Sequence, residues 1–347
     1  MICTIANRNR RGSPLRNTCT LVSLVCLLCA LPMQSYGVES STETMIFIDR
    51  SGKETTAPKI QISKAYIEGM ASLSGMAEFW KQQYADGSGG YVAPAYPRET
   101  KQRYEFCEGV NPSPIFVNGT GFFLDQQGVV AITVKGALNL TPFSEGYAAF
   151  ATKQIETDEG HIFTNYGFID RSGKIVVAPT FDEVLPFVEG LSAVRQNDKW
   201  GFVDKSGKFV IEPKFYSAHS FNDGFAPVQV QKYEETKSFD EPIWTFIDKE
   251  GKRILGDKGF MVASSFSEGL AAVCPLGSNR YGYIDKTGKV VIEPQFESAG
   301  DFSEGLAAVS MNGKFGYIDV NGQFVIQPQY LDAEKFYGGV ASVKVSK

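Results

Sequence analysis

The chain has 347 residues, 13% of them aromatic and 35 of them glycine, which is typical of many short strands joined by tight turns. This length is enough to bury a sizeable core. The formal net charge is -5 and the sequence contains no basic run, so we expect binding to neither nucleic acid nor anionic membrane surfaces.

The first 37 residues predict a signal peptide. Four arginines precede an apolar run from Leu21 to Leu31, which is shorter than the roughly 20 apolar residues that a membrane-spanning helix needs. Pro32 ends this run, and Ser35 and Gly37 are the small residues that a cleavage site needs. An uncleaved membrane anchor is the alternative. We therefore expect an exported protein of the periplasm, the cell surface or the extracellular space, with no transmembrane segment in the mature chain.

The cysteines predict no metal centre. Four of the six lie in the signal segment, which leaves Cys107 and Cys274. Two such residues at non-equivalent places specify neither a disulfide framework nor a metal cluster. We expect no metal and no cofactor.

From residue 45 to residue 345 the chain repeats one unit eight times. Each unit carries an Asp followed three residues later by a Gly, and then an aromatic–x–acid–Gly corner about twenty residues further on. The Asp–Gly pairs are Asp49/Gly52, Asp86/Gly89, Asp125/Gly128, Asp170/Gly173, Asp204/Gly207, Asp248/Gly251, Asp285/Gly288 and Asp319/Gly322, and the corner glycines are Gly69, Gly109, Gly146, Gly190, Gly224, Gly269, Gly305 and Gly339. Such a period predicts a repeat array and leaves no room for a separate catalytic domain.

The N-terminal part of this array allows two interpretations. Residues 64–83 have apolar residues at helical spacing, but Gly69 and Gly75 weaken a helix. The segment Tyr66–Ala71 also matches the corner of the later units. We therefore favour a repeat unit here.

Each unit is predicted to be a three-stranded meander. An aromatic and β-branched strand leads into the Asp-x-x-Gly turn, in which Asp accepts backbone hydrogen bonds and Gly supplies a positive φ. The second strand is expected to end at a proline nine residues after the Asp, as at Pro213 and Pro294, because proline cannot donate to a ladder. The third strand follows the corner, and Asn312-Gly313 predicts a type I′ hairpin back to the next unit.

The aromatic residue of each corner is expected in the core of the array. These residues are Tyr66, Phe106, Phe143, Phe187, Phe221, Phe266, Phe302 and Phe336.

The predicted fold is therefore all-β, with eight three-stranded meander repeats in a propeller-like ring or an open β-solenoid. The chain starts in a first strand, Met45–Asp49, and ends in a third strand, Val340–Val345. A tight hairpin joins these two kinds of strand elsewhere, so their pairing would remove two exposed edges and favours the closed form.

The segment Lys199–Lys208, with the sequence KWGFVDKSGK, resembles the signature of the bacterial WG repeat, also called KWG. The resemblance is strong in the four units at Asp170, Asp204, Asp285 and Asp319, although the Trp-Gly pair is intact only at Trp200-Gly201. It implies a β-structured interaction module without catalytic residues.

The corner acids are candidate binding residues, because a turn does not require an acid before its glycine. They include Glu145, Glu189, Asp223, Glu268 and Glu304, and Gly338 breaks the series in the last unit. Two interpretations stand. The acids bond to backbone or to a neighbouring lysine, or they form a row of carboxylates that faces a common partner.

Two long insertions provide the other candidates. The corner glycine is 14 residues from the next Asp in the tight units, but 24 residues after Gly146 and Gly224. Insertions at one structural position decorate one edge of an array, often the binding edge. Their candidate residues are Glu156, Asp158 and Glu159 in the first and Glu234 and Glu235 in the second.

We expect an exported, non-enzymatic scaffold that binds protein or cell-envelope glycan through one edge. One alternative is an envelope hydrolase that uses a carboxylate pair, although nothing among the 39 acidic residues selects one. Another is cation-dependent adhesion through the turn Asp residues, although calcium needs six to eight oxygen ligands close together.

Overall fold

The computed structural model describes residues 43–56, 59–62, 91–94, 114–117, 119–156, 162–231, 243–256 and 258–346. The chain divides into two compact units, Met1–Ser41 and Thr42–Lys347, and every described element belongs to the second. These described residues form strands and turns with no helix, which confirms the all-β prediction. The predicted signal peptide, Cys107, the turn at Asp86, and the corners at Gly69 and Gly109 lie outside the described residues, so these predictions stay untested.

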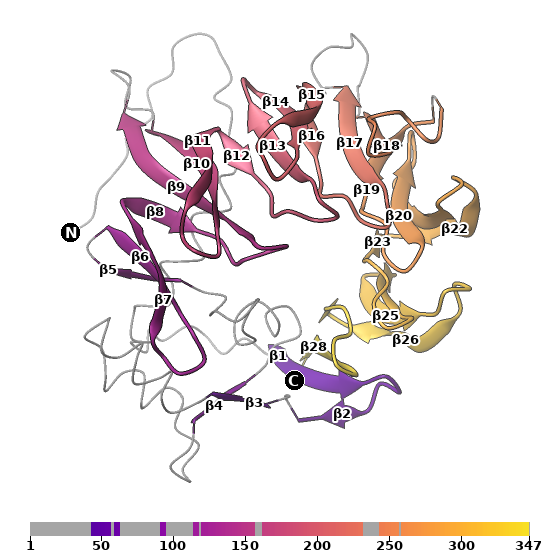
Figure 1. The fold of residues 1–347 in the computed structure, drawn as a ribbon. Helices are drawn as coiled ribbons and strands as arrows, with labels where there is room; N and C mark the ends of the chain where they lie inside the picture. Colours follow the sequence, from indigo (N-terminus) through magenta and orange to yellow (C-terminus); the bar gives the residue numbers. More distant parts are fainter. Residues whose placement is uncertain are drawn as a thin grey trace, which may run out of the picture. The chain divides into compact units, whose positions relative to one another are not determined.

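The strands pair antiparallel in small sheets (Figure 1). One sheet has the order β12-β13-β14-β15, formed by Glu183–Val184, Ser192–Gln196, Lys199–Val203 and Phe209–Phe215. A sheet of the same order contains β23 (Ser298–Ala299), β24 (Ala307–Met311), β25 (Lys314–Ile318) and β26 (Phe324–Tyr330). Another contains β8 (Ala137–Leu140), β9 (Tyr147–Glu156), β10 (Ile162–Asp170) and β11 (Ile175–Phe181).

The remaining sheets vary this plan. A seven-stranded sheet runs from β16 (Ser217–Ala218) through β17 (Ala226–Gln231), β18 (Ile243–Ile247), β19 (Phe260–Ala263), β20 (Leu270–Pro275) and β21 (Tyr281–Asp285) to β22 (Val290–Phe296). Smaller sheets join β3 (Lys59–Ile62) to β4 (Tyr91–Pro94), and β5 (Ile115–Val117) to β6 (Thr120–Leu124) and β7 (Val130–Lys135). The last sheet has the order β2-β1-β28-β27, with β1 (Glu43–Asp49), β2 (Glu54–Thr55), β27 (Asp332–Ala333) and β28 (Val340–Ser346).

Each typical sheet combines two repeats and has one strand more than predicted. The short strand β12 pairs with β13, the third strand of the same unit, whereas β14 and β15 belong to the next unit. A strand of two residues gives no period-2 pattern, which is why the sequence did not reveal it. The hairpin prediction is confirmed at Asn312-Gly313, where both residues have positive φ, 52° and 70°, between β24 and β25.

The Asp-x-x-Gly segments are turns, as predicted. In the turn after β14, Asp204 Oδ1 accepts hydrogen bonds from the Ser206 and Lys208 N–H groups, at 2.9 and 3.1 Å. Gly207 has φ 83° and donates its N–H to the Asp204 carbonyl at 2.9 Å. The same Gly-to-Asp bond closes the turns at Asp49, Asp125, Asp170, Asp248, Asp285 and Asp319.

The prediction that the proline ends the second strand was wrong. Pro213 lies inside β15, and Pro179, Pro294 and Pro328 lie inside β11, β22 and β26. Trp200 pairs with Phe215 and Phe202 with Ile211, so β15 bulges between these pairs. A bulge on an edge strand leaves the residue without a ladder bond to donate, which is why proline fits there.

The glycine of the Trp-Gly pair makes room for this bulge. A Cβ on Gly201 would lie 2.6 Å from the Ile211 carbonyl oxygen and 2.8 Å from Pro213 N. Gly167, Gly282 and Gly316 face the bulges at Pro179, Pro294 and Pro328 at similarly short distances. Where Thr245 replaces this glycine, the pairing is reduced to a bridge between Ile247 and Arg253 and the single pair Trp244↔Phe260. The glycine and the proline, twelve residues apart, therefore both belong to the bulge: the proline lies within it and the glycine makes room for it on the neighbouring strand.

The corner aromatics are core residues, as predicted. The six that lie in the described residues are Phe143, Phe187, Phe221, Phe266, Phe302 and Phe336, and all are at most 4% exposed. Each packs on the ring two residues before the turn Asp of its own unit, as Phe221 does on Phe202 with centroids 4.8 Å apart. Tyr283 and Tyr317 supply this ring in the last two units.

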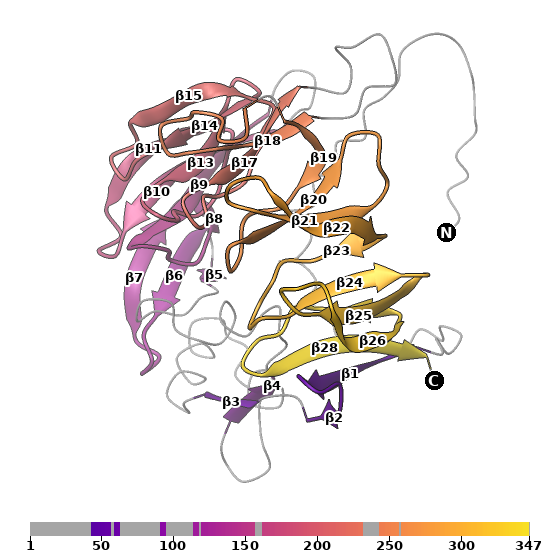
Figure 2. The same cartoon turned by 90° about the vertical axis from the view of Figure 1, so that its right-hand side faces the viewer.

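The first and last strands of the array lie side by side (Figure 2). β1 pairs with β28 in an unbroken register from Glu43↔Ser346 to Asp49↔Val340. This confirms the pairing that was expected for a closed array. The packing of successive turns is repeated here as well. A Cβ on Gly52 would lie 3.2 Å from the Ile326 side chain, much as one on Gly251 would lie 3.3 Å from Ile211.

Candidate functional site

Five of the described corners are two-residue turns that hold an acid in a left-handed conformation. At the corner before β13, Val188 and Leu191 form an antiparallel bridge across Glu189 and Gly190. These two residues have φ values of 55° and 87°, which is a type I′ geometry. The other corner acids of the described residues, Glu145, Asp223, Glu268 and Glu304, have φ between 52° and 58°.

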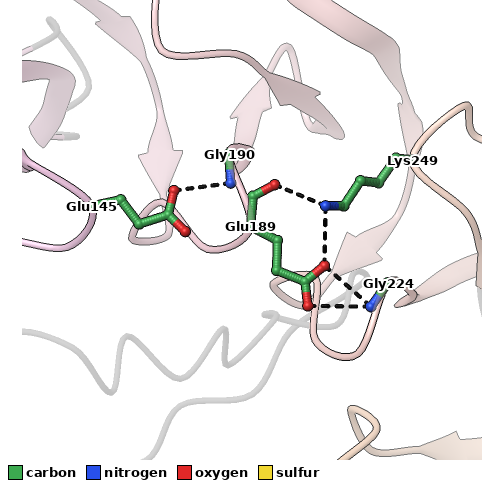
Figure 3. A network of polar contacts seen from close by, with 5 residues as sticks. All are labelled: Glu145, Glu189, Gly190, Gly224 and Lys249. Carbon is green, nitrogen blue, oxygen red and sulfur yellow. Dashed lines mark hydrogen bonds and ion pairs between the residues drawn. The ribbon is translucent and has the colours of Figure 1, made fainter.

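The acid of one corner binds the glycine of the next. Both carboxylate oxygens of Glu189 accept from the Gly224 N–H, at 3.1 and 3.2 Å (Figure 3). Lys249, directly after the next turn Asp, forms an ion pair with Glu189 Oε2 at 3.2 Å. Its Nζ also donates to the Glu189 carbonyl at 3.0 Å. One side chain thus joins a turn of its own sheet to two turns of the neighbouring sheet.

The same contact recurs from corner to corner, and we call this series the corner belt. Glu145 accepts from Gly190 N–H at 2.9 Å and Asp223 from Gly269 N–H at 2.9 Å. Glu268 accepts from Gly305 N–H at 2.9 Å, and Glu304 from Gly339 N–H at 3.0 Å. Lys205 and Lys286 pair with Glu145 and Asp223 at 3.2 and 3.5 Å, as Lys249 does with Glu189.

A serine before the acid adds a second bond at three corners. Ser144 Oγ donates to the Phe187 carbonyl at 2.7 Å, Ser267 Oγ to Phe302 at 2.8 Å and Ser303 Oγ to Phe336 at 2.7 Å. Two backbone groups of the next corner, the carbonyl of its aromatic residue and the N–H of its glycine, are thereby satisfied by the preceding unit.

The belt lowers the pKa of one corner carboxylate. Burial raises the pKa of Glu145, but the N–H groups of Gly190 and Glu189 and the Lys205 ammonium together hold the pKa of this carboxyl below its ordinary value of 4.5. Glu145 is therefore ionised at neutral pH, as its role as a hydrogen-bond acceptor requires.

The belt continues toward the chain ends with one substitution. Arg50, directly after the turn Asp49, donates to the Glu304 carbonyl at 2.6 Å, which is the position of Lys249 on Glu189. Gly338 stands where the other corners have an acid, with φ 60°. The last corner keeps the turn and lacks the carboxylate.

The corner acids therefore show the first of the two predicted arrangements. In the described corners their carboxylates bond to backbone N–H groups and, in three cases, to a lysine of a later unit. The sequence missed the glycine partners because they lie 35 to 46 residues away, and the lysines lie further still. A basic residue directly after the turn Asp was the available signal. Binding of an external partner by these acids stays a prediction.

The insertion candidates fall at the edge of the described residues. Glu156 is the last residue of β9, and Asp158, Glu159, Glu234 and Glu235 lie outside the described part. The strands leading to both insertions are described. β9 and β10 pair as far as Glu156↔Ile162, whereas the short hairpin of β13 and β14 ends at Gln196↔Lys199.

A bulge marks the point where each long hairpin leaves its sheet. Asn165 pairs with Thr152 and Thr164 with Gln154, so Lys153 is an extra residue in β9. Gln229 pairs with Trp244 and Gln231 with Ile243, so Val230 is an extra residue in β17. The short units make their two-residue turn at this same position. A bulge bends and twists a strand, so both hairpins are redirected where they begin.

The described residues contain neither a metal-binding cluster nor a membrane-spanning helix. No group of three or more His, Cys, Asp or Glu side chains in this part of the chain is placed to hold a metal ion. Within the same residues, no helix is long and apolar enough to cross a membrane.

Solved structures with a similar arrangement share little sequence with this chain. A eukaryotic initiation factor is 11% identical, with 65% of each chain covered and a TM-score of 0.47. Hsv2p of Kluyveromyces lactis is 10% identical, with 60% of this chain and 70% of that chain covered and a TM-score of 0.37. A virginiamycin B lyase from Staphylococcus aureus is 12% identical, with 68% and 95% covered and a TM-score of 0.35.

Four segments of the chain match a known repeat family. No curated protein matches the chain in sequence. The WG containing repeat matches at residues 166–200, 200–233, 281–315 and 315–347. These are the four units in which the glycine before the turn faces a proline bulge. Four units of the chain therefore match the WG containing repeat, and further described units keep the same turns and corners.

Proposed function

We propose that this protein is an exported, non-enzymatic repeat scaffold that binds a protein or a cell-envelope glycan through the edge from which its two long hairpins extend. The observation that carries the proposal is the common origin of these hairpins. Both leave their sheets at the position where other units turn back, and both do so through a one-residue bulge.

The corner belt supports a scaffold role. Its bonds join neighbouring units through backbone groups, so they hold the units in fixed register independently of the exposed side chains. A framework held in this way tolerates insertions at one edge, where loops on a rigid scaffold commonly carry binding residues.

Export is proposed from the N-terminal sequence, where a short apolar run follows four arginines. Expression of the full chain, with N-terminal sequencing of the product in each cell fraction, tests this part. Cleavage near Gly37 and recovery outside the cytoplasm are expected. An intact N-terminus on a cytoplasmic product would contradict it.

The binding edge is tested by shortening the hairpins. Residues 153–164 in one variant, and 231–242 in another, are replaced by Asn-Gly, the turn that the chain itself uses at Asn312-Gly313. Pull-down from envelope protein extract and co-sedimentation with purified envelope glycan are then compared with the unaltered protein. We expect the bound partner to be lost from one or both variants.

A matched control keeps the comparison specific. Replacement of Asn197-Asp198 by Asn-Gly alters a short hairpin and leaves both long ones intact. Equal binding by all variants would contradict the edge assignment. Turnover of a glycan or peptide that one acidic substitution abolishes would contradict the non-enzymatic assignment and support the hydrolase alternative.

A further inference from the structure

The hairpin between β24 and β25 carries a chemically reactive pair of residues. Asn312 and Gly313 form its turn, and both are exposed with positive φ. An Asn followed by Gly is prone to deamidation, because glycine has no side chain to hinder attack of its backbone nitrogen on the Asn amide carbon. Among the described residues no atom lies within 4 Å of a Cβ built on Gly313, so packing does not shield the pair. The ladder pairs Met311 with Lys314, on either side of the turn, and leaves the Gly313 N–H unused.

A carboxylate from outside the hairpin binds this N–H group. Glu297 Oε2, directly before β23, accepts from the Gly313 N–H at 2.8 Å. The other oxygen, Oε1, forms an ion pair with Arg280 Nη1 at 3.3 Å, so the arginine fixes the direction of the carboxylate. The bond from Gly313 is the main cause that holds the pKa of Glu297 below its ordinary value of 4.5. Glu297 is therefore ionised at neutral pH.

The equivalent hairpin between β13 and β14 has neither the reactive pair nor the long acid. Asp182 holds the place of Glu297 there, since both backbone N–H groups donate to the neighbouring strand, β13 or β24, at 2.9 Å. The turn residues are Asn197 and Asp198, so no glycine follows the asparagine. Of these two hairpins, the one with Asn-Gly is the one that a glutamate reaches.

The bond from Gly313 to Glu297 involves the atom that starts deamidation. The Gly313 nitrogen must lose its proton and attack Asn312 Cγ. A nitrogen–carbon bond then forms, the carbon–nitrogen bond of the side-chain amide breaks, and ammonia leaves with the proton, which gives a cyclic imide. Water opens the imide to aspartate or isoaspartate. A carboxylate that accepts the N–H opposes the first step, because it stabilises the protonated nitrogen and its charge disfavours a peptide anion beside it.

We propose that Asn312 is a deamidation site and that Glu297, oriented by Arg280, slows its conversion. The product adds a negative charge to the turn. As isoaspartate it also adds an atom to the backbone, which disturbs the register of Met311 with Lys314. This hairpin lies at the position from which the two long hairpins extend in other units, so Glu297 preserves the edge that is proposed to bind a partner. The inference itself does not depend on that binding.

The test measures deamidation at individual asparagines. The full-length protein and Glu297→Ala are incubated in mildly alkaline buffer below their unfolding temperatures, and peptide mapping by mass spectrometry follows aspartate and isoaspartate formation. We expect Asn312 to react about threefold to tenfold faster in Glu297→Ala, the effect of losing one exposed hydrogen bond to a charged acceptor. Asn321, which precedes Gly322, is the internal reference. The Gly322 N–H donates to the Asp319 carbonyl of its own turn at 2.9 Å, so its rate should be equal in both proteins.

Further variants separate protection of the nitrogen from loosening of the hairpin. Glu297→Gln keeps an acceptor without charge and Arg280→Gln leaves the carboxylate unoriented, so both should react at intermediate rates. Glu293→Gln, an exposed acid on β22 of the same unit, is the control and leaves the rate unchanged.

Hydrogen exchange across β24 and β25 checks that the hairpin stays paired in each variant. An unchanged or slower reaction at Asn312 in Glu297→Ala, or no product at Asn312 in any variant, would overturn the proposal. A faster reaction that appears only where exchange protection is lost, and not in Glu297→Gln, would assign the effect to loosening and overturn it as well.

Discussion

Glutamate is an unfavourable residue at the first position of a type I′ turn, because its Cβ crowds the backbone at positive φ. Asn and Gly are the usual choices, and the chain uses Asn at 312 and Gly at 338. The described corners before Gly338 nevertheless keep an acid. The bond from the carboxylate to the next corner explains this choice, since neither Asn nor Gly offers an ionised acceptor of that length.

Replacing one corner acid separates turn preference from belt bonding. Turn preference alone would make Glu189→Asn neutral or stabilising. We expect instead a loss of about 1–2 kcal/mol in the free energy of unfolding, because the Gly224 N–H loses its acceptor and Lys249 loses its ion pair. Urea unfolding of the variant and the unaltered protein measures this loss of unfolding free energy. Gly338→Asn, in the corner without a carboxylate, is the control with an expected change within about 0.5 kcal/mol. Equal changes in unfolding free energy for Glu189→Asn and Gly338→Asn would contradict a stabilising role of the corner belt.

Acid should weaken the belt at Glu145. Its folded pKa lies below the ordinary 4.5, so this carboxylate contributes stability above pH 4.5 that is lost as pH falls through the folded pKa. We expect the unfolding temperature to fall less steeply below pH 4.5 in Glu145→Gln than in the unaltered protein. Side-chain hydrogen bonds from Ser172 and Ser206 likewise lower the pKa of Asp170 and Asp204, so a residual acid dependence remains in the variant. Parallel curves for the two proteins would contradict the assignment.

At the scale of the element, the edge strand is the informative part of the unit. Its bulge needs a glycine on the neighbouring strand and tolerates a proline within itself, and both occur together in the four family-matching units. The bulge also interrupts regular pairing along the exposed edge, a feature that discourages association between edges. The glycine of the Trp-Gly signature is therefore explained by the close backbone contact between its own strand and the bulged edge strand.

Adding one methyl group to this glycine tests the contact. We expect Gly201→Ala to destabilise the protein by about 3 kcal/mol, because its Cβ would lie 2.6 Å from a backbone oxygen that cannot move without opening β15. Thr245→Ala, at the equivalent place in the unit without the bulge, is the matched control and should cost about 1 kcal/mol or less. Thermal or urea unfolding compares the two. A small effect at Gly201 would show that the bulge relaxes readily.

Local chemistry explains which elements were predictable from sequence. The turn at Asp204 and the hairpin at Asn312-Gly313 depend on residues a few positions apart, so their sequence specifies them. The position of Pro213 inside β15 depends on Gly201 across the sheet, and proline taken alone indicates a strand end. The partner of Glu189 lies in another sheet. The repeat spacing predicts where each corner acid lies along the chain. It cannot predict which residue of another unit the carboxylate bonds to.

At the scale of the whole molecule, the pairing of β1 with β28 makes the N-terminal strand part of the last unit. Three kinds of contact that join successive units occur again here: strand pairing, a turn glycine on Ile326, and Arg50 on the Glu304 carbonyl. Ile48 is fully buried among Tyr317, Phe336 and other residues of the C-terminal core. Residues almost 300 positions apart therefore share one core.

If β1 is a full member of the array, its core residue should matter as much as one from the middle. Ile48 and Ile318 each precede a turn Asp and both are 0% exposed. We expect Ile48→Ala and Ile318→Ala to cost similar amounts, about 2–5 kcal/mol, in a single unfolding transition. Hydrogen exchange at Ala341 and Val343 should accelerate in the Ile48 variant, since these residues pair with β1. A cost well below that of Ile318→Ala, with unchanged protection of β28, would mean that β1 is a detachable strand and that the array is stable without it.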